Sequence, residues 1–399
     1  MPSSERGRRA AGLDGLRALA ALSVVCFHVW LYRFPDPTRI RQSGLFDDVL
    51  SDFRLGLILF FVLSGYLLYR GFARAALRQD EPVNLGVYAL RRSARILPAY
   101  YLAMLGTFAL LWGARSTPGV RLPDGGDLAL FAFFGQNYST HTILTFNPVT
   151  WTLCLEVLFY ALLPLLGAIG YRWSEGRARR QAALLLGLIG FGLAWNAGVY
   201  LLGGNMLAGK ALPAYLPYFA LGMLLALWVE RSVERHGQPP RVGPLATLAL
   251  LVAGIAGVVC NGIWHASAAA DAVPLLTGAI QNLPAGIGFA ALLAAVVVGR
   301  GPATAWIHAR PLALIGLVSY GIYLWHVPLM LFGVRFGLLP HAFVPRLFTV
   351  LVPAVLAGTA SWLLVERVML AHASRMARRS AKAGSRRVVT TRLDARTAP

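Results

Sequence analysis

Apolar residues fill the chain in long runs that short polar segments separate. A helix needs about 20 apolar residues to cross the hydrocarbon core of a bilayer. Runs of this order lie at residues 13–31, 55–72, 96–114, 148–171, 181–202, 213–230, 242–262, 273–299, 312–334 and 343–366. A shorter apolar stretch at 128–138 is predicted to be a re-entrant or interfacial segment. The pattern predicts an all-α fold, a polytopic membrane helical bundle with ten transmembrane helices.

The positive residues favour one orientation of this bundle. Lys and Arg near the ends of membrane spans are enriched on the cytoplasmic side. With the N-terminus inside, 27 of the 37 Lys and Arg fall in inner segments and 9 in outer segments, and Arg17 lies within the first span. We therefore predict a multi-pass protein of the plasma (inner) membrane with both termini cytoplasmic.

The chain is expected to form one membrane domain. We predict a cytoplasmic N-terminal tail at residues 1–12, a transmembrane domain at 13–368 and a basic, disordered cytoplasmic tail at 369–399. No small-residue cleavage site follows the first apolar run, so this run is predicted to be a retained helix and not a signal peptide. The connecting segments are too short for a second globular domain.

Composition narrows the class of protein further. Charged residues make up 14% of the chain and hydrophobic residues 57%, whereas about a quarter of a typical soluble protein is charged. A net charge of +20 would suggest nucleic acid as the partner of a soluble domain, but here the positive residues follow the inner segments. The expected partner is therefore the lipid bilayer and not nucleic acid. The three cysteines lie in apolar runs without a CxxC pair, so neither a disulfide framework nor a metal site is predicted.

Ionisable residues inside the predicted spans are the candidate chemistry, because a charge in hydrocarbon costs at least about 2.5 kcal/mol. Arg17 and His28 are eleven residues apart, which puts them on one helix face about 16 Å from each other. Arg17 would lie near the inner end, where Asp14 can pair with it, and His28 in the outer half. Either side chain could instead extend to its own membrane interface, but together on one face they favour a function.

Five segments in this order resemble acyltransferase family 3, a family of integral-membrane O-acyltransferases. They are the Arg and His of the first span after LDGLRALA, and FFVLSGYLL, RRSARILPAYY, WTLCLEVLFY and SYGIYLWHVPL. The resemblance implies transfer of an acetyl or other short acyl group from cytoplasmic acyl-CoA, commonly acetyl-CoA, to a hydroxyl. The implied acceptor is a carbohydrate or glycosylated molecule, either an envelope glycan or a macrolide-type metabolite. Acyl-CoA would be a co-substrate, and no permanently bound cofactor is expected.

The donor site is predicted at the inner edge of the bundle. The phosphates of acyl-CoA need cationic partners there, and Arg17, Arg92 and Arg95 can supply them in agreement with the family pattern. Alternatively, Arg92 and Arg95 only satisfy the positive-inside rule, which is the preferred interpretation for Arg91.

The catalytic candidates are His28, Glu156 and His326. A sugar hydroxyl is a poor nucleophile near neutral pH, and an imidazole is a suitable base. His28 is the first candidate for this base and His326 the second. Glu156, about 12 Å deep in its span, could orient His28, bind acceptor hydroxyls or pair structurally with an arginine. Direct transfer and a covalent acyl-enzyme both remain open.

The substrate-binding candidates are polar or aromatic residues near the same spans. Trp151 could stack on a sugar or belong to the aromatic belt at the membrane surface. Ser319, Tyr320 and Tyr323 could contact substrate or form hydrogen bonds between helices. Ser64 is assigned to close packing of small residues.

A transporter is the alternative function, because ten spans with buried charges also suit a substrate pathway. The sequence shows neither inverted repeats nor paired broken helices. It also contains no P-loop, GxGxxG, GxSxG or HExxH motif, which leaves other enzyme classes without a sequence signal. An acyl-CoA-dependent O-acyltransferase is therefore the preferred prediction.

Overall fold

The computed structural model of the protein describes residues 3–33, 44–113, 115 and 121–379. These residues form helices joined by turns and loops, with an isolated bridge between Val242 and Gly299. The long helices are α1 (Ser3–Leu31), α3 (Gly56–Arg78), α4 (Leu85–Trp112), α6 (Trp151–Ser174), α7 (Ala178–Leu201), α9 (Leu212–His236), α10 (Pro244–His265), α13 (Leu283–Val298), α15 (Ser319–Arg335) and α16 (Phe343–Ser361). The shorter helices include α2 (Leu45–Asp52), α5 (Gly125–Ala132), α8 (Met206–Gly209), α11 (Ala268–Ala272), α12 (Pro274–Ile280) and α14 (Arg310–Leu317). The all-α prediction is confirmed.

The predicted spans are also confirmed. In the part of the chain that the structure describes, nine helices are long and apolar enough to cross a membrane. A tenth crossing results if α14 and α15, which meet at a bend of 66°, are counted as one span. This bend was not predicted, because the apolar run at 312–334 continues through it. A Cβ added at Gly316 would overlap the backbone carbonyl of Asp14, so α14 lies in direct backbone contact with α1.

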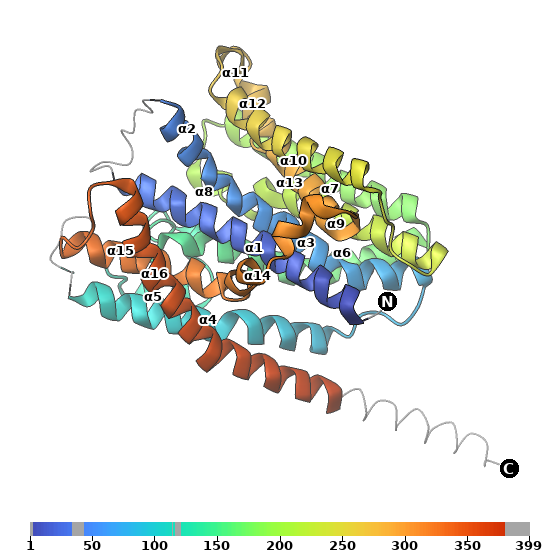
Figure 1. Ribbon diagram of the computed structural model, residues 1–399, viewed down its shortest axis with the longest axis horizontal. Helices are drawn as coiled ribbons and strands as arrows, with labels where there is room; N and C mark the ends of the chain where they lie inside the picture. The colour runs from blue at the N-terminus through green and yellow to red at the C-terminus, as the bar shows by residue number, and fades with distance from the viewer. Residues whose placement is uncertain (1–2, 34–43, 114, 116–120, 380–399) are drawn as a thin grey trace.

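The two ends of the described chain lie at the same end of the bundle, as an even number of crossings requires (Figure 1). We call this the terminal end and the opposite one the distal end. The helices α2, α8, α11 and α12 lie at the distal end (Figure 1).

Both predicted tails are partly helical. α1 begins at Ser3, and the last helix continues beyond α16 through a π-helical turn as far as Arg379. The predicted disorder is therefore wrong for residues 369–379, while residues 380–399 lie outside the described residues. Ala373 and Ala377 are buried, so this extension has a packed face.

α3 forms the centre of the bundle and packs closely on α9. A Cβ added at Gly65 would overlap the carbonyl of Phe219, and one added at Gly222 would overlap the carbonyl of Val62. The two backbones can approach this closely only because small residues face each other. At the terminal end of the same pair, the buried Glu230 accepts hydrogen bonds from Arg70 and Arg74.

Other helices form the outside of the bundle. Within the most apolar stretch of each helix, 17% of the residues of α7 and 22% of those of α10 are buried, whereas 67% are buried in the segment formed by α2 and α3. Leucines, isoleucines and valines cover their exposed faces, as expected for helices that contact lipid.

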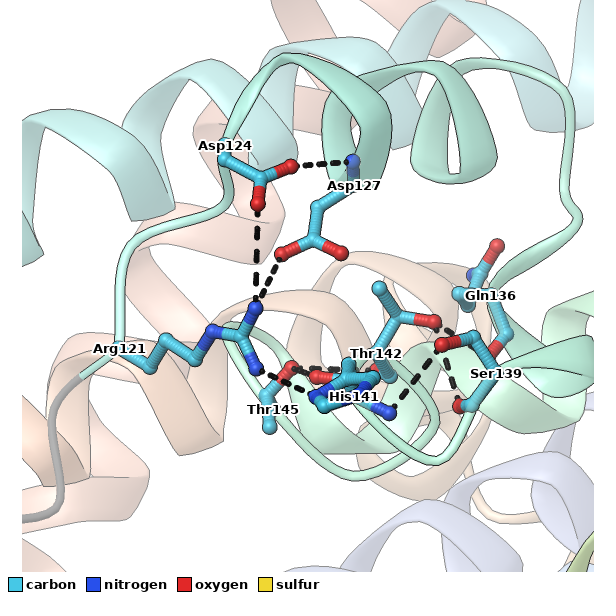
Figure 2. A network of polar contacts seen from close by, with 8 residues as sticks. All are labelled: Arg121, Asp124, Asp127, Gln136, Ser139, His141, Thr142 and Thr145. Carbon is cyan, nitrogen blue, oxygen red and sulfur yellow. Dashed lines mark hydrogen bonds and ion pairs between the residues drawn. The ribbon is translucent and has the colours of Figure 1, made fainter.

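The short segment predicted at 128–138 does not cross the bundle. It consists of the end of α5 and a 3-10 turn at Gln136–Tyr138. The hydroxyls of Tyr100 and Tyr101 donate to the last two carbonyls of α5, those of Phe131 and Ala132. A network of polar contacts connects the start of α5 to neighbouring residues (Figure 2). There Arg121 lies 3.0 Å from Asp127 and 3.1 Å from His141.

Candidate active site

A cavity of about 390 Å³ opens between helices α1, α3, α4, α6 and α15. Its wall contains seven of the ten predicted site residues, namely Arg17, Arg92, Arg95, Glu156, Ser319, Tyr320 and Tyr323. The remainder of the wall is largely apolar, with Leu57, Phe60, Phe61, Leu63 and Leu67 from α3. A pocket of this size and lining is typical of small-molecule sites.

The terminal end of the cavity is strongly basic. Arg91, Arg92 and Arg95 come from the first turns of α4, and Arg17 comes from α1. α4 starts at Asn84, whose side chain accepts a hydrogen bond from the Val87 amide, and this cap fixes where the three arginines project. Arg91 was interpreted as topological, but it lines the cavity with the others.

The cavity arginines have few acidic partners. Arg17 donates to Asp14 over 2.6 Å, and Arg95 interacts electrostatically with Glu366, which is buried. The Nε of Arg92 is buried and has no hydrogen-bond partner among the described residues. The site therefore keeps an excess of positive charge and an available donor.

A carboxylate lies in the middle of the cavity. The Oε1 of Glu156 accepts hydrogen bonds from the Ser64 hydroxyl at 3.0 Å and the Tyr160 hydroxyl at 2.6 Å. Among the described residues, the ion pairs do not include Glu156. The structural pairing with arginine that was left open is thus not observed. Ser64 and Tyr160 were not predicted as site residues, and Ser64 was assigned to packing alone.

The wall contributed by α15 uses its hydroxyls to hold neighbouring elements. Tyr320 donates to the carbonyl of Ile96 on α4, and Tyr323 lies 3.0 Å from the carbonyl of Val149 and 2.7 Å from the Thr152 hydroxyl. The hydroxyl of Ser319 donates to Gly316. The structure therefore shows the interhelical hydrogen bonds that were one of the two alternatives for the tyrosines, while the same side chains line the cavity.

His28 and His326 form a pair just beyond the cavity wall. The Nδ1 of His28 lies 3.2 Å from the Nε2 of His326, and the ring centroids are 5.0 Å apart. The ring of Tyr323 lies 5.8 Å from His326 and 6.0 Å from Phe60. Neither histidine is among the residues that line the cavity. Tyr323 thus stands between the cavity and the histidine pair, and Phe60 packs against it.

The two histidines differ in exposure. His326 is fully buried, with a relative exposure of 0%, whereas His28 is partly exposed. Of the two residues, only His28 therefore has exposed surface.

Trp151 lies away from the cavity. Its ring packs 5.4 Å from that of Tyr215, and the ammonium group of Lys210 lies 4.1 Å from the indole centroid. This places a cation–π contact at the distal start of α6.

The chemical groups of the site suit an anionic ligand. Guanidinium groups bind phosphates through charge-assisted hydrogen bonds, and four of them line one end of the cavity. In the described part of the chain, no group of three or more His, Cys, Asp or Glu side chains is arranged to hold a metal ion.

The chain is similar in sequence to several known proteins. The chain is 26% identical to YrhL of Bacillus subtilis over 359 residues, which cover 82% of the chain and 49% of the relative. It is 25% identical to the O-acetyltransferase OatA of Staphylococcus aureus, with 82% of the chain and 51% of the relative covered. The peptidoglycan O-acetyltransferase OatA of Listeria monocytogenes is 24% identical, with 80% and 49% covered.

The chain spans about half the length of the curated relatives it matches. No solved structure matches it. The sequence profile of acyltransferase family 3, described as an acyltransferase domain, matches residues 10–365. This match extends from the start of the first span to the last one, and it includes every residue of the cavity except Leu370 and Ser374. The chain therefore belongs to acyltransferase family 3.

Proposed function

We propose that the protein is a membrane O-acyltransferase that moves an acetyl or other short acyl group from cytoplasmic acyl-CoA to a hydroxyl of a carbohydrate or glycosylated acceptor. The observation that carries this proposal is the cavity, which has arginines at one end and adjoins a histidine pair at the other. Family membership and the names of the relatives support acyl transfer.

The basic end of the cavity is the proposed binding site for the donor. The positive-inside rule favours the terminal end as the cytoplasmic one, where acyl-CoA is present. Its phosphates would bind Arg17, Arg92 and Arg95, and the free Nε of Arg92 offers a further donor. The thioester arm would then extend along the apolar wall toward the distal end.

His28 is the proposed general base of the transfer. The acceptor hydroxyl gives its proton to His28 while its oxygen attacks the thioester carbonyl, so that the new C–O bond forms and the C–S bond breaks. The proton then passes from His28 to the sulfur that leaves as CoA. Because Tyr323 stands between the cavity and the histidine pair, its side chain has to turn aside before the thioester arrives.

Glu156 is proposed to bind a polar group of a substrate. Its known hydrogen bonds use Oε1, so Oε2 can accept from an acceptor hydroxyl or from an amide of the donor arm. Ser64 and Tyr160 would keep the carboxylate in place. Trp151 and Ser319 have no proposed contact with the donor, and a role for them in binding the acceptor stays a prediction.

Among the possible acceptors, the relatives favour a glycan of the cell envelope, since OatA of Listeria monocytogenes is named a peptidoglycan O-acetyltransferase and YrhL of Bacillus subtilis a putative one. A macrolide-type acceptor rests on the family resemblance alone. An envelope acceptor agrees with the predicted location in the plasma membrane, because its outer surface faces such glycans.

The test uses the full chain in lipid nanodiscs with labelled acetyl-CoA and a soluble peptidoglycan disaccharide. We expect mass spectrometry to detect acetylated disaccharide that is missing with His28→Ala protein of the same thermal stability. The transporter alternative predicts no transfer by either protein. If His28→Ala transfers acetyl groups at the normal rate, the assignment of the base is wrong.

A further inference from the structure

The histidine pair carries an inference about the protonation of His28 that rests on the proposed function. We propose that His326 is a positioning residue that holds His28 in one tautomer, with hydrogen on Nδ1 and the lone pair of Nε2 open to the acceptor hydroxyl. His326 itself would exchange no proton with a substrate. The two residues lie on α1 and α15, 298 positions apart in the chain.

Two backbone carbonyls indicate which nitrogen of each ring carries the hydrogen. The Nδ1 of His28 is 2.9 Å from the carbonyl oxygen of Val24, and the Nδ1 of His326 is 3.1 Å from that of Ile322. A carbonyl oxygen only accepts hydrogen bonds, so each Nδ1 must carry the hydrogen. A neutral imidazole has one N–H group, and both Nε2 atoms are therefore unprotonated.

The contact between the rings agrees with this assignment. The Nε2 of His326 lies 3.2 Å from the Nδ1 of His28. The N–H group at this Nδ1 therefore donates both to the lone pair of His326 Nε2 and to the carbonyl oxygen of Val24. With the opposite tautomers, the lone pair of each Nδ1 would point at a carbonyl oxygen, and both rings would lose a buried hydrogen bond.

Burial separates the roles of the two rings. His326 is fully buried, and both of its nitrogens have partners. His28 is partly exposed, and its hydrogen bonds use Nδ1 alone among the described contacts. When His28 takes a proton on Nε2, its positive charge strengthens the hydrogen bond that Nδ1 donates to His326. The second ring therefore favours the protonated form that arises during transfer.

Substitution of His326 can separate positioning from proton transfer. Glutamine offers a carbonyl oxygen near the former Nε2 and can accept from His28, but it cannot act as a base. Phenylalanine fills the space and accepts nothing. We expect His326→Phe to lower kcat by about 10- to 100-fold, by analogy with the loss seen when the partner that orients a metal-bound histidine is removed. His326→Gln should recover most of this loss, and the KM for acetyl-CoA should change little in both variants.

A matched control is His265→Phe, since His265 also bonds a backbone carbonyl, that of Gln281, at the distal end of α10 and away from the cavity. This variant should transfer acetyl groups at the rate of the unaltered protein. The positioning role is overturned if folded His326→Gln is as inactive as His326→Phe, or if His326→Phe keeps the full kcat.

Nitrogen-15 NMR of histidine-labelled protein tests the tautomer without any activity. The His28 signals, identified by their loss in His28→Gln, should show a protonated Nδ1 and an unprotonated Nε2. An unprotonated Nδ1 would overturn the proposal. If the unaltered protein transfers no acyl group, the proposed function fails, but the NMR result still decides the tautomer.

Discussion

At the scale of the residue, the site consists of polar and charged side chains, which are rare in the interior of a membrane bundle. Arg17, His28 and Glu156 could be predicted from the sequence because a charge or an imidazole within an apolar run is rare enough to require an explanation. Ser64 and Tyr160 could not, because a hydroxyl is common in membrane helices. Their contact with Glu156 depends on how α3 and α6 are rotated against each other. Arg91, which also lines the cavity, was assigned to topology because its position outside the predicted span is explained equally well in that way.

The arginine cluster predicts a specific defect in donor binding. Replacing Arg95 by Ala should raise the KM for acetyl-CoA by about 10- to 100-fold, because a charge-assisted hydrogen bond contributes about 1.5–3 kcal/mol. The kcat should change much less. Arg179→Ala, an exposed arginine at the same end of the bundle, is the matched control and should leave KM unaltered. Steady-state kinetics with varied acetyl-CoA measures both, and an equal rise in KM for the two variants would contradict a specific site.

Glu156 predicts a different defect. Glu156→Gln keeps the shape of the side chain and can still accept from Ser64 and Tyr160, but it removes the charge. We expect kcat/KM for the acceptor to fall by at least about tenfold, since hydrogen bonds to a charged group are about twice as strong as neutral ones. The thermal stability of the protein should stay close to its original value. An unchanged kcat/KM would mean that the carboxylate has only a structural role.

At the scale of the element, the sequence determines where helices lie but not which of them touch. Ten apolar runs of the right length were enough to predict the spans. The bend between α14 and α15 was missed, because hydropathy carries no information about helix direction. Its position follows from a tertiary contact, the close approach of Gly316 to the backbone of α1. The extension to Arg379 was missed because its alanines and arginines also suit a disordered tail.

The packing of α3 on α9 predicts where small residues are required. Gly65→Ala places a methyl group against the Phe219 carbonyl, and overpacking of this kind typically costs about 1–3 kcal/mol. Gly187→Ala on the exposed face of α7 meets nothing within 4 Å and should be neutral or stabilising, since alanine is the better helix former. Thermal unfolding of both variants in detergent compares them. A similar melting temperature for the two would show that the helices can separate without cost.

At the scale of the whole molecule, the positive residues are concentrated at one end of the bundle, and this could be predicted from the sequence. Which helices lie next to each other could not be predicted. The cavity joins residues of α1, α3, α4, α6 and α15, and no pattern within one segment indicates that these five meet. The resemblance to a family could name the residues but could not place Tyr323 between the cavity and the histidines.

The orientation of the bundle has a direct test. Single cysteines at Arg179 and at Tyr138, in a background without the three native cysteines, lie at the terminal and distal ends. We expect a membrane-impermeant thiol reagent added to whole cells to label Tyr138→Cys only, because the terminal end should face the cytoplasm. Permeabilised cells should label both and serve as the control. Labelling of Arg179→Cys in intact cells would show that the arginine cluster faces away from the cytoplasm, which would rule out the proposed donor site.

The pairing of His28 with His326 has a consequence for how the protein is made. The ribosome delivers α1 first, and nearly three hundred further residues must follow before α15 emerges. Throughout this interval the imidazole of His28 lacks its partner on α15 and keeps only its contact with the Val24 carbonyl of its own helix. The contact between the two histidines can therefore form only after α15 has been made, which places it among the last contacts between helices that the new chain completes.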